Sequence, residues 1–163
     1  MEAILATIQS ELSDLNDAEH LTRVCVRLLA ATLLGALVGW ERELRDSAAG
    51  LRTHMLVALG CAVLVMVPLE GGMEPADVSR VLQGVIAGIG FLGAGAVLKS
   101  GADNQIRGLT TAASIWATSA IGVTVGLGHE ATAILVTLLV LFILAVVWRM
   151  EQWMTRSRDA RSR

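Results

Sequence analysis

The sequence predicts an all-α protein: a polytopic transmembrane bundle of about five helices, preceded by an N-terminal amphipathic surface helix. Hydrophobic residues make up 54% of the chain and charged residues only 17%. The mean hydropathy is +0.62, which is too apolar for a soluble domain of this size to cover with a polar surface. Glycine is abundant at 16 residues and proline scarce at 2, which favours closely packed membrane helices over loops.

Residues 1–20 form the first expected element, an acidic amphipathic helix. Its apolar residues recur on one helical face, while its carboxylates lie elsewhere. The segment lacks the basic start and the continuous apolar core of a signal peptide, so we expect it to stay on the mature protein.

Five spans follow within residues 21–148. Their predicted ranges are 24–40, 54–69, 81–98, 109–127 and 131–148. Each is near the ~20 residues that cross a bilayer, and the shorter ones indicate little tilt or snorkelling ends. Only the last is apolar on every face, so we expect it to meet lipid most broadly.

Basic residues are divided unevenly between the two sides of the predicted bundle. The loops after the first, third and fifth spans carry most of them, whereas the other side holds Arg80, with Arg23 and Arg27 at the lip of the first span. By the positive-inside rule, the N-terminus lies outside and the Arg-rich tail at 149–163 is cytoplasmic.

Small residues recur every four positions in two of the spans. The helix-contact residues predicted from these ridges and from the third span are Gly35, Gly39, Gly88, Gly90, Gly93, Ser114, Thr118, Gly122 and Gly126. Such ridges either let helices pack closely, within one bundle or between copies, or line a polar passage. The glycines of the third span also match a dinucleotide-binding spacing, but the apolar context lacks the strand–helix–strand unit that this motif requires.

The loop between the first two spans is chemically the richest part of the chain. Glu41 follows the first span, while Arg52 and His54 precede the second, so we predict that Glu41 pairs with Arg52 or His54 at the membrane boundary. The alternative is ordinary interfacial charge. The predicted polar cluster, drawn from this loop and from the start of the fourth span, comprises Glu41, Arg42, Arg52, Thr53, His54, Asn104, Arg107, Thr110 and Thr111.

No cofactor is expected, although magnesium stays open as an ion. Glu41 is the only candidate metal ligand, and one carboxylate falls short of the roughly six oxygens that magnesium prefers. A homo-oligomer would multiply Glu41 into a ring. The chain shows no catalytic triad order, no metal-ligand spacing and no phosphate loop in a suitable context, so we expect neither an enzyme nor a nucleic-acid-binding protein.

Four blocks of this sequence, in order, resemble the membrane domain of the MgtC/SapB family. They are GALVGWERE at 35–43, GLRTHMLVALG at 50–60, GIGFLGAGAVL at 88–98 and RGLTTAASIWATSAIGVTVGLG at 107–128. The resemblance implies a bacterial inner-membrane protein linked to growth in scarce magnesium, to acid tolerance and to survival inside phagocytes. For the better-known members it also implies restraint of the F-type ATP synthase.

Some members of that family carry a soluble ACT-like domain after the fifth span, whereas this sequence ends about fifteen residues after Trp148. We therefore expect the membrane domain to suffice for any activity. The leading hypothesis is a non-enzymatic regulator in magnesium homeostasis, acting through membrane helix contacts on partners such as the F-type ATP synthase. The alternative is an oligomeric magnesium or other cation transporter or channel, with Glu41 at the pathway.

Overall fold

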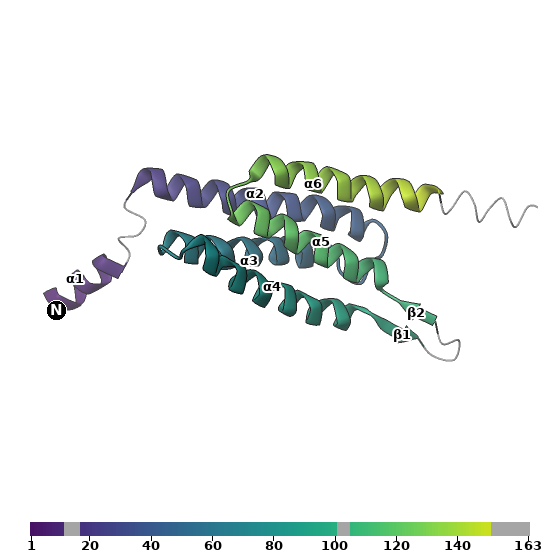
Figure 1. Ribbon diagram of the computed structural model, residues 1–163, viewed down its shortest axis with the longest axis horizontal. Helices are drawn as coiled ribbons and strands as arrows, with labels where there is room; N and C mark the ends of the chain where they lie inside the picture. Colours follow the sequence, from purple (N-terminus) through teal and green to yellow (C-terminus); the bar gives the residue numbers. More distant parts are fainter. Residues whose placement is uncertain (12–16, 101–104, 151–163) are drawn as a thin grey trace, which may run out of the picture.

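The computed structural model describes residues 1–11, 17–100 and 105–150, in which helices joined by short loops make up the fold, with one short hairpin. The elements are α1 (Glu2–Glu11), α2 (Ala18–Glu43), α3 (Leu51–Glu70), α4 (Pro75–Ala96), β1 (Leu98–Ser100), β2 (Gln105–Arg107), α5 (Leu109–Gly126), α6 (Glu130–Phe142) and the π-helical continuation η2 (Ile143–Val147). Five of the described helices are long and apolar enough to cross a membrane, which confirms the predicted transmembrane bundle. Figure 1 shows them side by side, with α1 apart from the bundle.

Three helices begin well before the predicted spans: α2 at 18 instead of 24, α3 at 51 instead of 54 and α4 at 75 instead of 81. The helix α2 starts at Ala18, where the Asp17 side chain caps it by accepting the Glu19 amide at 3.0 Å. Residues 18–20, expected in the first helix, therefore belong to α2, and α1 ends at Glu11. Proline in the first helical turn lets α4 begin at Pro75, because this residue has no amide hydrogen to leave unpaired. The tail at 151–163 lies outside the described residues.

A short antiparallel hairpin joins α4 to α5 and was not predicted. Leu98 pairs with Arg107, Lys99 with Ile106 and Ser100 with Gln105. Gly108 then turns the chain into α5 with a φ of +90°, and a side chain there would run into the carbonyl of Ala96. Glycine is therefore the only residue that fits this corner without strain.

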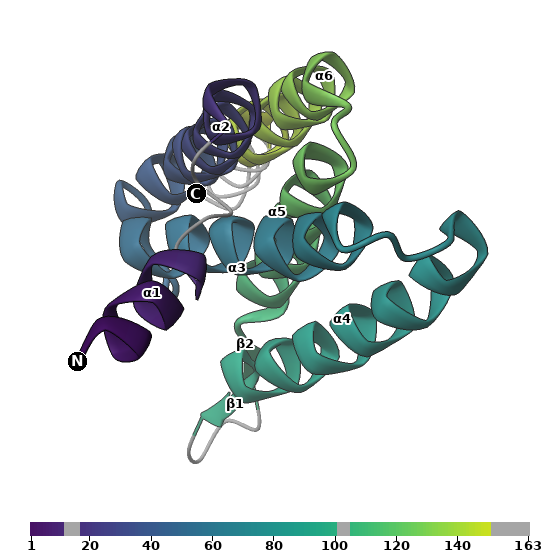
Figure 2. The same ribbon diagram turned by 90° about the vertical axis from the view of Figure 1, so that its left-hand side faces the viewer.

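The helix α3 packs against both α2 and α5, and small residues form both contacts (Figure 2). A Cβ atom added at Gly35 of α2 would lie 2.6 Å from the carbonyl oxygen of His54. A Cβ atom at Gly126 of α5 would lie 2.6 Å from the carbonyl oxygen of Ala62, and one at Gly122 would collide with the backbone of Ala58. These contacts bring the backbones as close as membrane helices pack.

Two apolar clusters form the core. The larger joins α2, α3, α5, α6 and η2 around Ala31, Leu34, Val38, Ala58, Ala62, Ile121, Val125, Ala133 and Leu144. The smaller joins α3, α4 and α5 around Cys61, Val85, Ile89 and Ile115, with Ala49 from the loop before α3. The rest of the apolar surface, including most of α6, is exposed, as it must be if lipid covers it.

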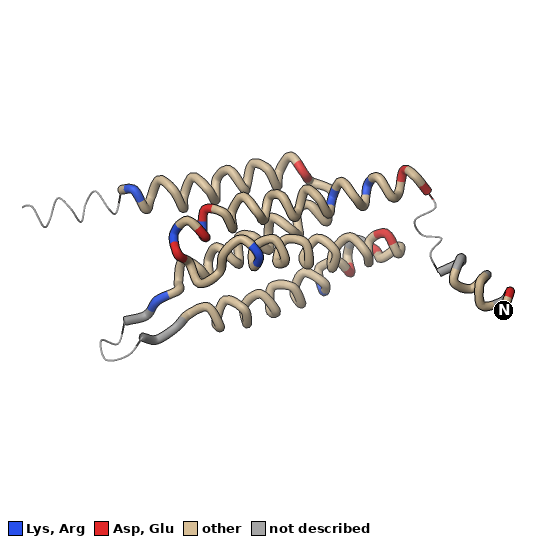
Figure 3. The backbone as a smooth tube through the Cα atoms, turned by 180° about the vertical axis from the view of Figure 1, so that it is seen from behind, with Lys and Arg blue, Asp and Glu red and all other residues tan. Residues whose placement is uncertain are grey.

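Charged residues gather toward the two ends of the bundle, and few lie along the length between them (Figure 3). Arginines at one end come from the last turn of α2, the start of α3 and the end of the last span. This distribution fits a bilayer around the middle of the bundle.

Candidate functional site

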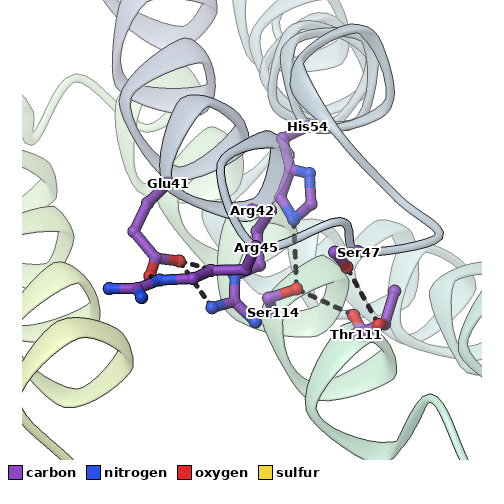
Figure 4. A network of polar contacts seen from close by, with 7 residues as sticks. All are labelled: Glu41, Arg42, Arg45, Ser47, His54, Thr111 and Ser114. Atoms are coloured by element: carbon purple, nitrogen blue, oxygen red, sulfur yellow. Dashed lines mark hydrogen bonds and ion pairs between the residues drawn. The ribbon is translucent and has the colours of Figure 1, made fainter. Parts of the chain in front are cut away.

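The last turn of α2 and the turn that follows it carry a compact group of ion pairs at the Arg-rich end of the bundle. The carboxylate of Glu41 lies 2.6 Å from Nη2 of Arg42 and 3.2 Å from Nε of Arg45. The side chains of Arg42 and Glu41 are only 6% and 13% exposed. Arg45 also stacks on Trp148, with its guanidinium carbon 3.4 Å from the ring centroid. Figure 4 shows both arginines converging on Glu41.

The predicted partners of Glu41 are wrong, and helix rotation explains why. Gly39 marks the face of α2 that touches α3, because a Cβ atom there would lie 2.7 Å from the Cα of Leu51. At about 100° per residue, Glu41 lies about 200° further round and faces away from α3. It therefore pairs with Arg42 and Arg45, while Arg52 is exposed on α3 and His54 turns toward α5.

A second polar group links α3 to α5 inside the bundle. His54 is fully buried, with Nδ1 2.8 Å from the carbonyl oxygen of Gly50 and Nε2 3.1 Å from the hydroxyl of Ser114. The same hydroxyl lies 2.8 Å from the carbonyl oxygen of Thr111. Because a carbonyl can only accept, a neutral His54 carries its proton on Nδ1. The single hydroxyl proton of Ser114 is then shared between Nε2 of His54 and the Thr111 carbonyl.

The loop before α3 joins this group through Ser47, whose Oγ lies 3.0 Å from Oγ1 of Thr111 (Figure 4). Thr111 is buried in the first turn of α5. Three segments of the chain, namely the α2–α3 loop, α3 and α5, are thus tied together by hydrogen bonds at one level of the bundle. In a lipid environment such bonds satisfy groups that water cannot reach.

The structure divides the predicted polar cluster. Glu41 and Arg42 form the ion-pair group, and His54 and Thr111 form the buried group. The remaining side chains that the structure describes, Arg52, Thr53, Arg107 and Thr110, are exposed. Asn104 lies outside the described residues.

Sequence reasoning missed Arg45, Ser47 and Trp148, and placed Ser114 only on a packing ridge. Arg45 stands four residues after Glu41, the spacing at which opposite charges meet on a helix, so a signal for that pair was present in the sequence. Ser47 and Trp148 carried no comparable signal, because their contacts depend on how distant segments fold together.

The ion-pair group does not resemble a site for a free cation. One carboxylate there faces two guanidinium groups, so the local charge is positive. Within residues 1–11, 17–100 and 105–150, no three His, Cys, Asp or Glu side chains come together in a way that could hold a metal ion.

Residues 28–153 match the sequence profile of the MgtC family. The chain belongs to the MgtC family. The match covers all five spans from Leu28 onward, with both polar groups, and leaves α1 outside.

Curated relatives in the MgtC family come from several bacteria. The protein named MgtC of Salmonella typhimurium strain LT2 is 44% identical over 116 residues, which cover 71% of this chain and 48% of the relative. Protein MgtC of Brucella abortus is 44% identical over 121 residues, covering 73% of this chain and 48% of the relative. Protein SrpB of Synechococcus elongatus is 41% identical over 144 residues, covering 80% of this chain and 79% of the relative.

This member of the MgtC family spans about half the length of the curated MgtC proteins it matches. No solved structure matches it. The family and the five apolar helices together make it a bacterial membrane protein.

Proposed function

We propose that this MgtC-family chain is a non-enzymatic protein of the bacterial inner membrane that serves magnesium homeostasis and adaptation to low magnesium or acid. It acts by contact between its membrane helices and those of another protein. Its N-terminus lies outside and its C-terminus in the cytoplasm. The observation that carries the proposal is an uncovered glycine face on α4.

Gly84, Gly88 and Gly95 of α4 would meet nothing within 4 Å if a Cβ atom were added to each. At about 100° per residue they share one side of the helix, together with Phe91. Phe91 is 81% exposed. Gly35 and Gly122, by contrast, are filled by the backbone of α3, whereas these α4 glycines are free to admit a helix from outside.

The position of α4 supports this role. Figure 2 shows α4 at the side of the bundle, away from α2 and α6. The partner we propose is a second copy of this chain or a membrane subunit of the F-type ATP synthase. Cation transport through Glu41 is the weaker candidate, because magnesium would have to displace two arginines from a carboxylate that they already neutralise.

Growth in magnesium-poor medium tests the proposal in a host that lacks its own family member. We expect Gly88→Leu to insert and fold at the wild-type level, because its neighbourhood is empty, yet to lose growth support because the bulky side chain blocks the partner. Ala131→Leu, an exposed position on α6, is the matched control and should behave as wild type. Normal growth with Gly88→Leu would exclude the contact face.

A photo-crosslinking residue at Phe91 identifies the partner directly. The proposal expects an adduct with a second copy or with a membrane subunit of the F-type ATP synthase. Adducts with lipid alone would contradict it.

A further inference from the structure

A long apolar groove with a polar mouth runs between α3 and α4. Its volume is about 450 Å³, and its walls are Leu56, Val57, Gly60, Cys61, Leu64, Ile89 and Leu92. Arg52 and Thr53 line its mouth at the Arg-rich end of the bundle. One end of the groove is therefore charged, and the rest of its lining is apolar.

Arg52 supplies the positive charge at the mouth. Arg52 is exposed, and among the described residues its guanidinium makes no ion pair. A second hollow of about 550 Å³ adjoins the mouth and is lined by Trp40, Glu43, Gly50, Leu51, Arg52 and Thr53. The carboxylate of Glu43 is turned to the start of α3, where it accepts the Leu51 amide at 3.0 Å.

The groove has the length of one membrane leaflet. From Arg52 to Leu64 the helix rises about 18 Å at 1.5 Å per residue. Half of a hydrocarbon core is about 15 Å thick. About two thirds of the way from Arg52 to Leu64, Gly60 leaves the wall open, because a Cβ atom added there would meet nothing within 4 Å.

We propose that this groove binds one anionic phospholipid. The phosphate accepts hydrogen bonds from the guanidinium of Arg52 and the hydroxyl of Thr53, and one acyl chain lies along Gly60 between α3 and α4. Trp40 is 61% exposed at the adjoining hollow and stands where indole rings meet lipid headgroups. The positive mouth fits the phosphate and the apolar walls fit the acyl chain. An anionic phospholipid carries both groups in one molecule.

Native mass spectrometry of the purified full chain, released from detergent micelles containing phosphatidylglycerol or phosphatidylcholine, tests the proposal. We expect the wild type to retain one phosphatidylglycerol in preference to phosphatidylcholine. Arg52→Gln should lower phosphatidylglycerol retention roughly tenfold, the size expected for one lost charge-assisted hydrogen bond. Gly60→Leu should lower the retention of both lipids, because its side chain fills the groove.

Two controls separate this site from general lipid contact. Arg149→Gln removes an exposed charge at the same end, and Gly90→Leu fills an open glycine site that does not line the groove. Both should retain lipid as the wild type does. Circular dichroism and gel filtration check that every variant is folded.

Wild-type phosphatidylglycerol retention by folded Arg52→Gln or Gly60→Leu would overturn the proposal. Equal loss in Arg149→Gln would also overturn it, since the effect would then reflect net charge. Displacement of the lipid by inorganic phosphate at millimolar concentration would show that the mouth binds the anion alone, and would likewise reject an acyl-chain site.

Discussion

The imidazole of His54 and the hydroxyl of Ser114 lie 3.1 Å apart across the contact between α3 and α5, and both residues are buried. A shift of one residue in the register of either helix would move its polar group by about 1.5 Å along the helix axis and turn it by about 100° about that axis. The pair therefore fixes the register in which the two small-residue surfaces meet.

A double-mutant cycle with His54→Ala and Ser114→Ala measures the strength of this pair. We expect a coupling free energy of about 0.6 kcal/mol, and no more than about 1.7 kcal/mol, the range found for side-chain hydrogen bonds between membrane helices. Equilibrium unfolding in detergent gives the four stabilities that the cycle needs. Strict additivity of the two substitutions would show that the bond contributes nothing.

Glu41→Gln should destabilise the protein by about 3 kcal/mol, because Arg42 would keep its buried charge without a full counter-charge. The double variant Glu41→Gln with Arg42→Gln should recover part of that loss. Thermal unfolding in detergent measures both effects.

Glu19→Gln serves as the matched control, since Glu19 pairs with Arg23 on the exposed surface of α2. A surface pair of this kind contributes about 0–1 kcal/mol. If Glu41→Gln cost no more than Glu19→Gln, the ion-pair group would have no structural role.

Gly122→Ala should lower stability by about 1–3 kcal/mol, because its methyl group would push against the backbone of Ala58. Gly90→Ala adds the same methyl group where nothing lies within 4 Å. There we expect no loss, or a gain of up to about 1 kcal/mol from higher helix propensity. Denaturant unfolding measures the free energy of unfolding of both variants. Equal changes would mean that the close approach of α3 and α5 at Gly122 does not limit stability.

The proposed orientation is open to a labelling test in a Cys25→Ser background. Glu74→Cys lies at the turn between α3 and α4, and Ala48→Cys lies in the α2–α3 loop at the opposite end of α3. In cells whose outer membrane has been made permeable and whose inner membrane is intact, an impermeant maleimide should label Glu74→Cys. It should label Ala48→Cys only after lysis. The reverse pattern would invert the topology.

The spans were predictable because the bilayer sets their length and their composition. The fourth expected span, 109–127, differs from α5 (Leu109–Gly126) by one residue. Proline at 75 marks the start of α4, which apolar counting alone places at 81. The hairpin between β1 and β2 escaped prediction because three-residue strands carry too little pattern to recognise.

The candidate site was less predictable because it depends on helix rotation. Glu41 and Arg42 are neighbours in the chain and therefore close in any fold. The direction in which Glu41 points, however, follows from the contact of Gly39 with α3. Which glycines are filled and which are open also depends on tertiary neighbours, so Gly122 and Gly88 look alike in the sequence and differ in the fold.

The central place of α3 has a consequence for biosynthesis. A ribosome delivers α2 and α3 to the membrane before α5, so α3 first pairs with α2 while the side that carries His54 still lacks its partner Ser114. The helix α4 is delivered next, but it packs more extensively on α5 than on α3, so the His54 side of α3 stays open until α5 arrives. The nascent chain therefore passes through a stage in which the imidazole of His54 lacks its hydroxyl partner, and the arrival of α5 supplies it.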